Sequence, residues 1–172
     1  MKNQKGIRVA VVGLGFGSSF VPIYLDHPDV ESVTICDANP DRLNKVGNRF
    51  NVKKRAQDVS EIVKADDLDA VHLLSGIPDH ARQTIALLKA GKHCACAVPM
   101  ATSIVDLKAI VAAQRSSKKN YIFHFLLSIA SRSADDHHWI YSPIAIYEIL
   151  ESDIVRNEMP KEHSAESNGR TR

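Results

Sequence analysis

The sequence predicts an α/β protein with a doubly wound parallel sheet in three layers, followed by an irregular or helical C-terminal tail. Three observations lead to this fold class. Short apolar segments alternate with helical segments from residue 7 to about residue 125, a glycine-rich turn follows the first apolar segment, and an acidic residue ends the second. This alternation is typical of βαβ units, whose parallel strands are covered on both faces and therefore read as apolar throughout.

The size and composition fit one domain with a substantial core and a short appendage. The chain has 172 residues, of which 44% are hydrophobic and 24% charged. We expect the main domain at residues 1–125, a covering segment of uncertain structure at 126–150 and a disordered tail at 151–172, because the last stretch is polar and carries both charge signs.

The charge and the apolar pattern exclude several classes of partner. A net charge of +2 gives no strong field toward nucleic acid or an anionic membrane, so neither is expected. No apolar run reaches the roughly 18 residues of a membrane span, and the N-terminus lacks the pattern of a signal peptide. Three cysteines, two of them one residue apart, fit reduced thiols and a cytoplasmic protein.

Six short apolar segments are the predicted strands. They cover residues 7–12, 32–36, 70–74, 93–98 and 121–125, with a weaker one at 53–56. Pro22 falls inside the first expected helix, where a proline removes a backbone donor, so it should kink that helix or delay its start.

The later helices carry clear start and stop signals. Asn39 before Pro40 is typical of an N-cap followed by the first helical residue. Two further starts have the spacing of a capping box, Asp58 with Glu61 and Ser103 with Asp106. After Pro78 an apolar stripe recurs at helical spacing before a glycine ends the helix; these residues are Ala81, Ile85, Leu88 and Gly91.

The glycine-rich turn predicts a dinucleotide site in a Rossmann fold. Gly13 suits the turn, Gly15 lets a pyrophosphate approach the main chain, and Ser18 is small enough for close packing of helix on strand. Asp37 follows at about the spacing of 20 residues expected for a ribose-binding acid. Because its charge repels a 2′-phosphate, NAD is favoured over NADP, although Arg42 can offset that repulsion. The alternative is a turn that binds nothing, with Asp37 as a cap.

The order of four segments resembles the Gfo/Idh/MocA oxidoreductases over residues 7 to about 125. The segments read GLGFGS, ICDANPDRL, SGIPDHARQTIALLKAGKH and CACAVPMA. The resemblance implies a Rossmann domain that binds NAD(P), joined to a second domain that supplies contacts to a sugar, a cyclitol or a related compound. It also implies the cofactor-binding residues, namely Gly13, Leu14, Gly15, Phe16, Gly17, Ser18, Asp37, Arg42, Ser75, Gly76, His80, Val98 and Pro99.

His80 has a structural alternative, and Val98 departs from the family pattern. His80 matches a histidine of the family, but a helix-start residue bonded to nearby backbone is an equal alternative. In the family a Glu-Lys-Pro sequence brings a proton-transferring lysine to the reacting hydroxyl, and here it reads Ala97-Val98-Pro99. Valine cannot exchange a proton, and such groups contribute about 100- to 10,000-fold in rate. No catalytic residue is therefore assigned.

No metal site is expected. Cys94 and Cys96 lie on one face of a strand but lack two further ligands, so buried thiols are the better interpretation, as for Cys36. His72 reads as a core or edge histidine. The run at 135–138, Asp-Asp-His-His, reads as a solvated turn.

The family pattern stops near residue 125, so the chain is expected to be a truncated or frame-altered relative that keeps the cofactor half. The predicted function is that of an NAD(P)-dependent oxidoreductase reduced to its nucleotide-binding domain. The alternative is a non-catalytic dinucleotide-binding module. A small-molecule substrate is expected only if a second domain or subunit is supplied, and a homo-oligomer is possible.

Overall fold

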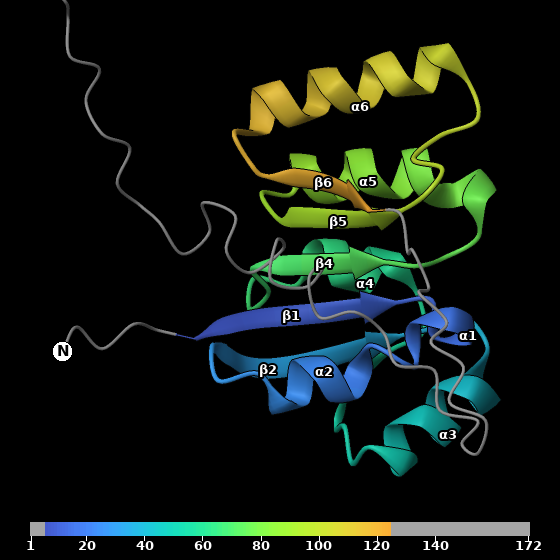
Figure 1. Cartoon of the computed structure of the whole chain (residues 1–172), viewed down its shortest axis with the longest axis vertical. Coiled ribbons are helices and arrows are strands. Elements are labelled where there is room, and N and C mark those ends of the chain that lie inside the picture. Colours follow the sequence, from blue (N-terminus) through green and yellow to red (C-terminus); the bar gives the residue numbers. More distant parts are fainter. Residues whose placement is uncertain (1–5, 125–172) are drawn as a thin grey trace, which may run out of the picture.

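The computed structural model describes residues 6–124, which form one six-stranded parallel sheet with helices on both faces (Figure 1). The strands lie in the order β3-β2-β1-β4-β5-β6. Their bounds are β1 Ile7–Val12, β2 Val30–Cys36, β3 Lys54–Ala56, β4 Ala70–Leu73, β5 His93–Ala97 and β6 Tyr121–His124. All six predicted strands are present, with ends that differ by at most two residues among those described.

Seven helical segments connect these strands within the described part of the chain. Their bounds are α1 Leu14–Gly17, α2 Val21–Asp26, α3 Pro40–Arg49, α4 Val59–Lys64, the 3₁₀ helix η1 Ile77–Asp79, α5 His80–Lys89 and α6 Ile104–Ser117. The predicted α/β class with a doubly wound parallel sheet in three layers is confirmed.

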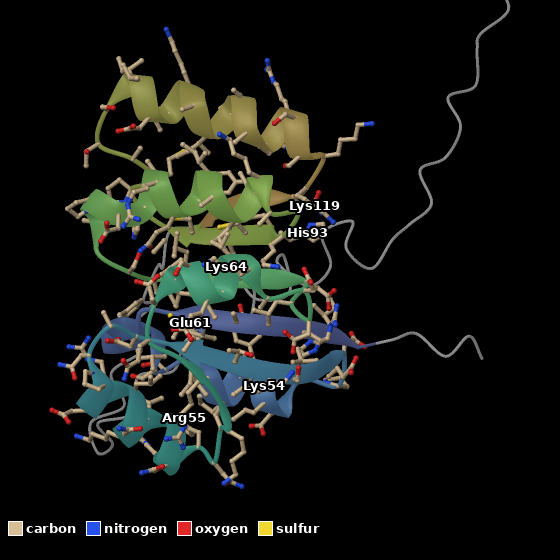
Figure 2. The ribbon with its side chains drawn as sticks, turned by 180° about the vertical axis from the view of Figure 1, so that it is seen from behind. Lys54, Arg55, Glu61, Lys64, His93 and Lys119 are labelled. Carbon is tan, nitrogen blue, oxygen red and sulfur yellow. The ribbon has the colours of Figure 1, made fainter. Side chains whose placement is uncertain are left out.

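The sheet separates two apolar cores. On one face, α2 and α3 bury Val21, Tyr24 and Leu43 against the first strands. On the other face, α4 and α5 bury Ile62 and Leu87. Figure 2 shows this second face from behind, with Glu61 and Lys64 on α4 in front of the sheet. The two halves of the chain therefore place their helices on opposite faces.

Pro22 has the expected effect on the first helix. The helical segment after β1 ends at Gly17 and resumes at Val21, so the proline lies in the first turn of α2, where no N–H is needed. The predicted delay is confirmed, because one expected helix has become two short ones.

The predicted caps are present. The Asn39 side chain accepts a hydrogen bond of 3.0 Å from the N–H of Arg42. Glu61 completes a capping box with Asp58, and Ser103 Oγ accepts from the N–H of Asp106 at 3.1 Å. These side chains satisfy donors that the first turn of a helix leaves unpaired.

The stripe predicted on α5 is only partly right. Ala81 and Leu88 are buried as expected, but Ile85 is half-buried and Leu87 is the fully buried neighbour. The helix is covered by α6 as well as by the sheet, so its buried surface is wider than the one predicted stripe. Gly91 follows it with φ of 75°, which is the left-handed conformation expected of a helix-ending glycine.

Two predicted segments, residues 126–150 and 151–172, lie outside the described residues, as does the run at 135–138. No helix within residues 6–124 is both long and apolar enough to cross a membrane.

Candidate functional site

A cleft opens at the carboxyl ends of β1, β2 and β4. β1 lies between β2 and β4, so the connections that leave β1 and β4 run to opposite faces and leave a crevice between them. The cleft has a volume of about 660 Å³, within the range of small-molecule sites. It is lined by parts of the glycine turn, by the residues after β2 and β4, and by the segment that joins β3 to α4.

Three glycines of the turn have three different reasons to lack a side chain. Gly13 has φ of 89°, and a Cβ there would collide with the carbonyl of Leu74. At Gly17 a Cβ would lie 3.0 Å from Leu74 Cδ1, so this residue lets α1 pack closely on the sheet. At Gly15 a Cβ would meet only Arg42 Nη1, at 3.9 Å, so packing within the chain does not require a glycine. The space at Gly15 therefore faces the cleft.

This geometry corrects one expectation. Close packing of helix on strand was predicted for Ser18, but Gly17 provides it, and Ser18 is the half-buried residue that ends α1. The reason is that the buried Gly17 lies against Leu74 and Val11 of the sheet side, whereas Ser18 is turned partly toward solvent.

Leu14 and Phe16 do not line the cleft with their side chains. The Leu14 side chain is buried, and its N–H donates to Asp37 Oδ2 at 2.8 Å. The Phe16 ring is 46% exposed and lies edge-on to Phe20, with ring centroids 5.7 Å apart.

Asp37 is the most connected polar residue of the cleft. Its carboxylate is buried and accepts the N–H groups of Leu14 and Asn39, each at 2.8 Å. Arg42 Nη1 lies 3.1 Å from Oδ2 and 3.2 Å from Oδ1. The acid thus fastens the glycine turn to the start of α3 and carries a cation in front of it.

Ser75 and Gly76 line the cleft after β4, as expected. Ser75 Oγ donates to Gln83 Oε1 at 2.5 Å, and Gln83 is itself buried at the cleft wall. Sequence reasoning missed this residue, because a glutamine inside a helix gives no local signal. It also missed the wall after β3, although the carboxyl end of that strand indicates it; this wall contains Gln57, Asp58, Val59 and Ser60.

His80 lies behind the cleft rather than in it. The ring is 1% exposed, with Nδ1 2.8 Å from the carbonyl oxygen of Pro99 and Nε2 2.9 Å from that of Ser75. This geometry agrees with the interpretation of a helix-start residue bonded to backbone. Val98 is half-buried, Pro99 is exposed after a cis peptide bond, and neither lines the cleft beside the glycine turn.

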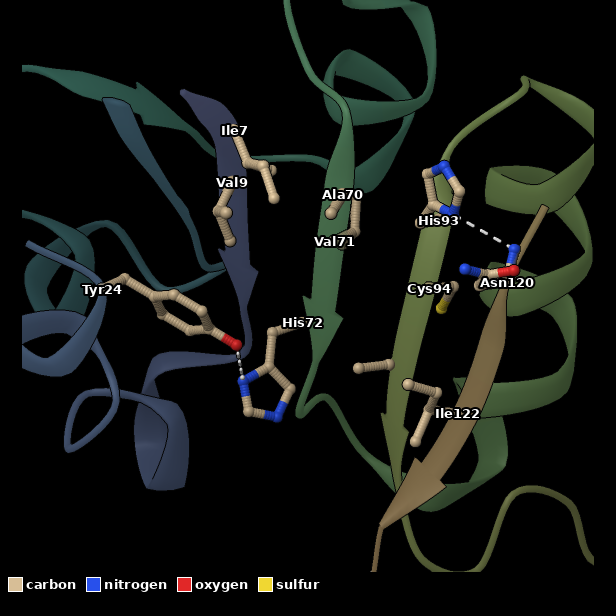
Figure 3. Close-up of a pocket in the computed structure, with 11 residues that line it drawn as sticks. Ile7, Val9, Tyr24, Ala70, Val71, His72, His93, Cys94, Asn120 and Ile122 are labelled. Atoms are coloured by element: carbon tan, nitrogen blue, oxygen red, sulfur yellow. Dashed lines mark hydrogen bonds between the residues drawn. The ribbon is translucent and has the colours of Figure 1, made fainter. Parts of the chain in front are cut away.

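His72 is a core histidine, as predicted. It is 1% exposed and shares a hydrogen bond of 3.0 Å between Nδ1 and the Tyr24 hydroxyl. Figure 3 shows the two side chains pointing toward one another beside a cavity of about 20 Å³. The cavity is apolar and too small for a cofactor, so the large cleft is the candidate site.

The three cysteines are buried free thiols, as predicted. Burial raises the pKa of Cys36 to about 12 and that of Cys96 to about 11, and it raises the pKa of Cys94 further. Within residues 6–124, no three metal-ligating side chains come together.

A glycine turn that faces an acidic strand end across the switch point of a parallel sheet defines a dinucleotide-binding Rossmann domain. The particular family follows from comparison. The chain belongs to the Gfo/Idh/MocA oxidoreductase family, whose model, described as an oxidoreductase family with an NAD-binding Rossmann fold, matches residues 7–125. The resemblance drawn from the four sequence segments is confirmed.

Two relatives show how much of the family this chain spans. It is 28% identical over 144 residues to 4-carboxy-2-hydroxymuconate-6-semialdehyde dehydrogenase of Sphingobium sp., covering 83% of this chain and 44% of the relative. It is 30% identical over 110 residues to D-apiose dehydrogenase of Paraburkholderia graminis, covering 63% and 29%. The chain therefore spans less than half of the length of these relatives.

Solved structures share the fold. The WlbA dehydrogenase of Bordetella pertussis, solved with NADH and UDP-GlcNAcA, has a TM-score of 0.64 and 26% identity, covering 70% of this chain and 35% of that one. An oxidoreductase of Agrobacterium radiobacter, solved with NAD+, L-tartaric acid and magnesium, has a TM-score of 0.65 and 23% identity, covering 70% and 35%.

Proposed function

We propose that the cleft binds NAD and that this chain is the cofactor half of an oxidoreductase acting at a hydroxyl-bearing carbon of a sugar, a cyclitol or a related compound. One observation carries the proposal: the unfilled space at Gly15 opens into a cleft whose far side presents the Asp37 carboxylate. A bound nicotinamide supplies a hydride acceptor or donor for such a reaction.

The residues of the cleft fit two parts of the cofactor, the pyrophosphate and the adenosine ribose. First-turn N–H groups of a helix have no acceptor inside it, and after Leu14 has donated to Asp37, Gly15 is the next residue of the cleft wall. Its missing side chain gives a pyrophosphate access to the main chain. Each oxygen of Asp37 can accept a further hydrogen bond, so the two ribose hydroxyls can be held there once Arg42 moves aside.

NAD is the proposed cofactor, with NADP as a weaker ligand. Asp37 repels a 2′-phosphate, but Arg42 lies on the same carboxylate and neutralises part of its charge. Following the resemblance, we assign Ser75 and Gly76 to the nicotinamide side. The resemblance also assigns His80, Val98 and Pro99 to the cofactor, although none of the three lines the cleft. We place the protein in the cytoplasm, where buried thiols stay reduced.

Hydride transfer needs a partner for the hydroxyl proton, and Val98 cannot be that partner. Its position after β5 is the one that the family fills with lysine. A catalytic reaction therefore requires an acid-base group and substrate contacts from a second domain or subunit. The same observation favours a second candidate function, a dinucleotide-binding module without catalysis.

Calorimetry with NAD, NADH and NADP on the purified chain tests the binding proposal. We expect binding of NAD(H), with NADP weaker. The absence of any dinucleotide binding would contradict both functions. A turnover screen with cyclitols, aldoses and NAD then separates them, because reproducible reduction of NAD excludes a module that only binds.

A further inference from the structure

The His80 ring joins two loops that are far apart in sequence. Its Nε2 lies 2.9 Å from the carbonyl oxygen of Ser75, after β4, and its Nδ1 lies 2.8 Å from that of Pro99, after β5. Carbonyl oxygens only accept hydrogen bonds, so both contacts need an N–H on the ring. A neutral imidazole has one N–H and an imidazolium has two.

From this geometry we infer that His80 is held as the imidazolium and acts as a positioning residue that clamps the loop after β4 to the loop after β5. The ring is 1% exposed, so water does not compete for either bond. A charged donor also makes shorter and stronger hydrogen bonds to carbonyls than a neutral one. The two carbonyl dipoles thus stabilise the buried charge.

The ionisable side chains on the elements around the ring have other partners, are exposed or stay neutral. Among the described residues of β4, η1, α5 and β5, these are Asp79 with Arg82, His72 with Tyr24, His93 with the N–H of Asn120, the exposed Lys89, and Cys94 and Cys96 as buried thiols. The segment at 98–101, Val-Pro-Met-Ala, contains no titratable side chain. The Ser75 hydroxyl donates its hydrogen to Gln83, so it cannot take the place of the His80 ring as a hydrogen-bond donor to the loop after β4.

The clamp has a consequence for the cleft, and this part rests on the proposed function. Ser75 lines the cleft, and its main chain is tied to the loop after β5 only while the ring carries both protons, because the two bonds need two N–H groups. Loss of one proton leaves either Ser75 or Pro99 without its donor. If the dinucleotide prefers the clamped loops, protonation of His80 and dinucleotide binding strengthen one another by linkage.

The first test needs no cofactor. Nitrogen NMR on the full chain labelled with ¹⁵N-histidine, at about pH 6, reports which ring nitrogens carry protons, and the His80 signals are assigned by their loss in His80→Gln. We expect both nitrogens of His80 to be protonated and protected from solvent exchange. A single protonated nitrogen would overturn the inference.

The second test measures NADH affinity at about pH 6 and about pH 9. We expect the affinity of the unmodified chain to fall about tenfold over this range, which is the effect of losing one charged hydrogen bond. His80→Gln should bind weakly and equally at both values. The control is His27→Gln, because His27 is the C-cap of α2 ahead of the amino end of β2, away from the cleft at the carboxyl ends of the strands, and its loss should leave the pH dependence intact.

Equal pH dependence in the unmodified chain and in His80→Gln would contradict the role of the clamp in binding. A chain that binds no NADH at any pH contradicts the proposed function instead. The NMR experiment still tests the clamp in that case, because it needs no cofactor.

Discussion

The guanidinium of Arg42 lies across the carboxylate of Asp37, with Nη1 within 3.2 Å of both oxygens. The arginine side chain is about half exposed, whereas the carboxylate is buried and also accepts two backbone N–H groups. The pair therefore has a fixed member and a movable one. A ligand that approaches Asp37 has to exchange bonds with Arg42, not with the backbone.

Asp37→Ala is expected to weaken NAD binding more than NADP binding. It removes the ribose acceptor for both cofactors, but it also removes the repulsion that acts only on the 2′-phosphate. The loss for NAD should be roughly tenfold or more, as for hydrogen bonds to a charged group. Calorimetry checks this, with Asp37→Asn as the control, because asparagine keeps one acceptor oxygen. Equal losses for the two cofactors would show that Asp37 is not at the ribose.

Arg42→Ala should act in the opposite sense on cofactor preference. Without the cation, Asp37 keeps its full charge toward the cleft, so NADP affinity should fall several-fold while NAD affinity stays nearly constant or rises. Binding of both dinucleotides at two salt concentrations measures this. Lys45→Ala, on the same helix α3, is the matched loss of a positive charge. An identical effect of the two substitutions would mean that the arginine acts only through net charge.

The roles of Gly13 and Gly15 in the glycine turn can be separated by alanine substitutions. Gly13→Ala should destabilise the chain by more than about 2 kcal/mol, because its φ is positive and the Cβ collides with a carbonyl. Gly15→Ala should leave stability within about 1 kcal/mol but lower NADH affinity at least tenfold, because its Cβ fits the protein and not the ligand. Denaturant unfolding measures the stability of each variant, and titration with NADH measures its affinity. An unchanged NADH affinity in Gly15→Ala would show that the pyrophosphate does not bind at this turn.

Acid should destabilise the fold partly through Asp58. Hydrogen bonds from Ser60 lower the pKa of Asp58 in the folded chain, so their contribution is present above the unfolded pKa of about 3.9 and is lost as the pH falls through the lower folded value. Asp58→Asn keeps a good N-cap but does not titrate. Its melting temperature should match the unmodified chain at pH 7 and fall less between about pH 5 and pH 2. Parallel acid curves for the two proteins would contradict the assignment.

The thiols of Cys36, Cys94 and Cys96 should not react in the folded chain. Burial raises their pKa values far above neutrality, and only the thiolate is the nucleophile. A disulfide reagent at pH 8 should label none of the three in the native protein and all three in denaturant. Fast labelling of the native chain at any of them would show that the sheet core opens.

Much of this fold is visible in the sequence because its signals are local. Asn39, Asp58 and Ser103 cap helices by bonds within a few residues, and the apolar strands need no partner to be recognised. The site is less predictable because its contacts are long-range. The bond from Leu14 to Asp37, the bond from Ser75 to the buried Gln83 and the contact of Gly17 with Leu74 depend on how the elements pack. The shift of the packing role from Ser18 to Gly17 has the same origin, since it depends on how α1 lies against Leu74 and Val11.

The fastening of Asp37 sets a rule for anyone who redesigns the cofactor preference of this scaffold. Replacing Asp37 itself also leaves the N–H groups of Leu14 and Asn39 without their acceptor. A gain in selectivity is therefore accompanied by a loss of the bonds that hold the glycine turn to the start of α3. Ala38 is exposed on the same cleft wall, and its short side chain leaves no hydrogen bond to lose. A lysine or arginine at Ala38 adds positive charge to the cleft while the bonds of Asp37 to Leu14 and Asn39 stay intact, so engineering should begin there.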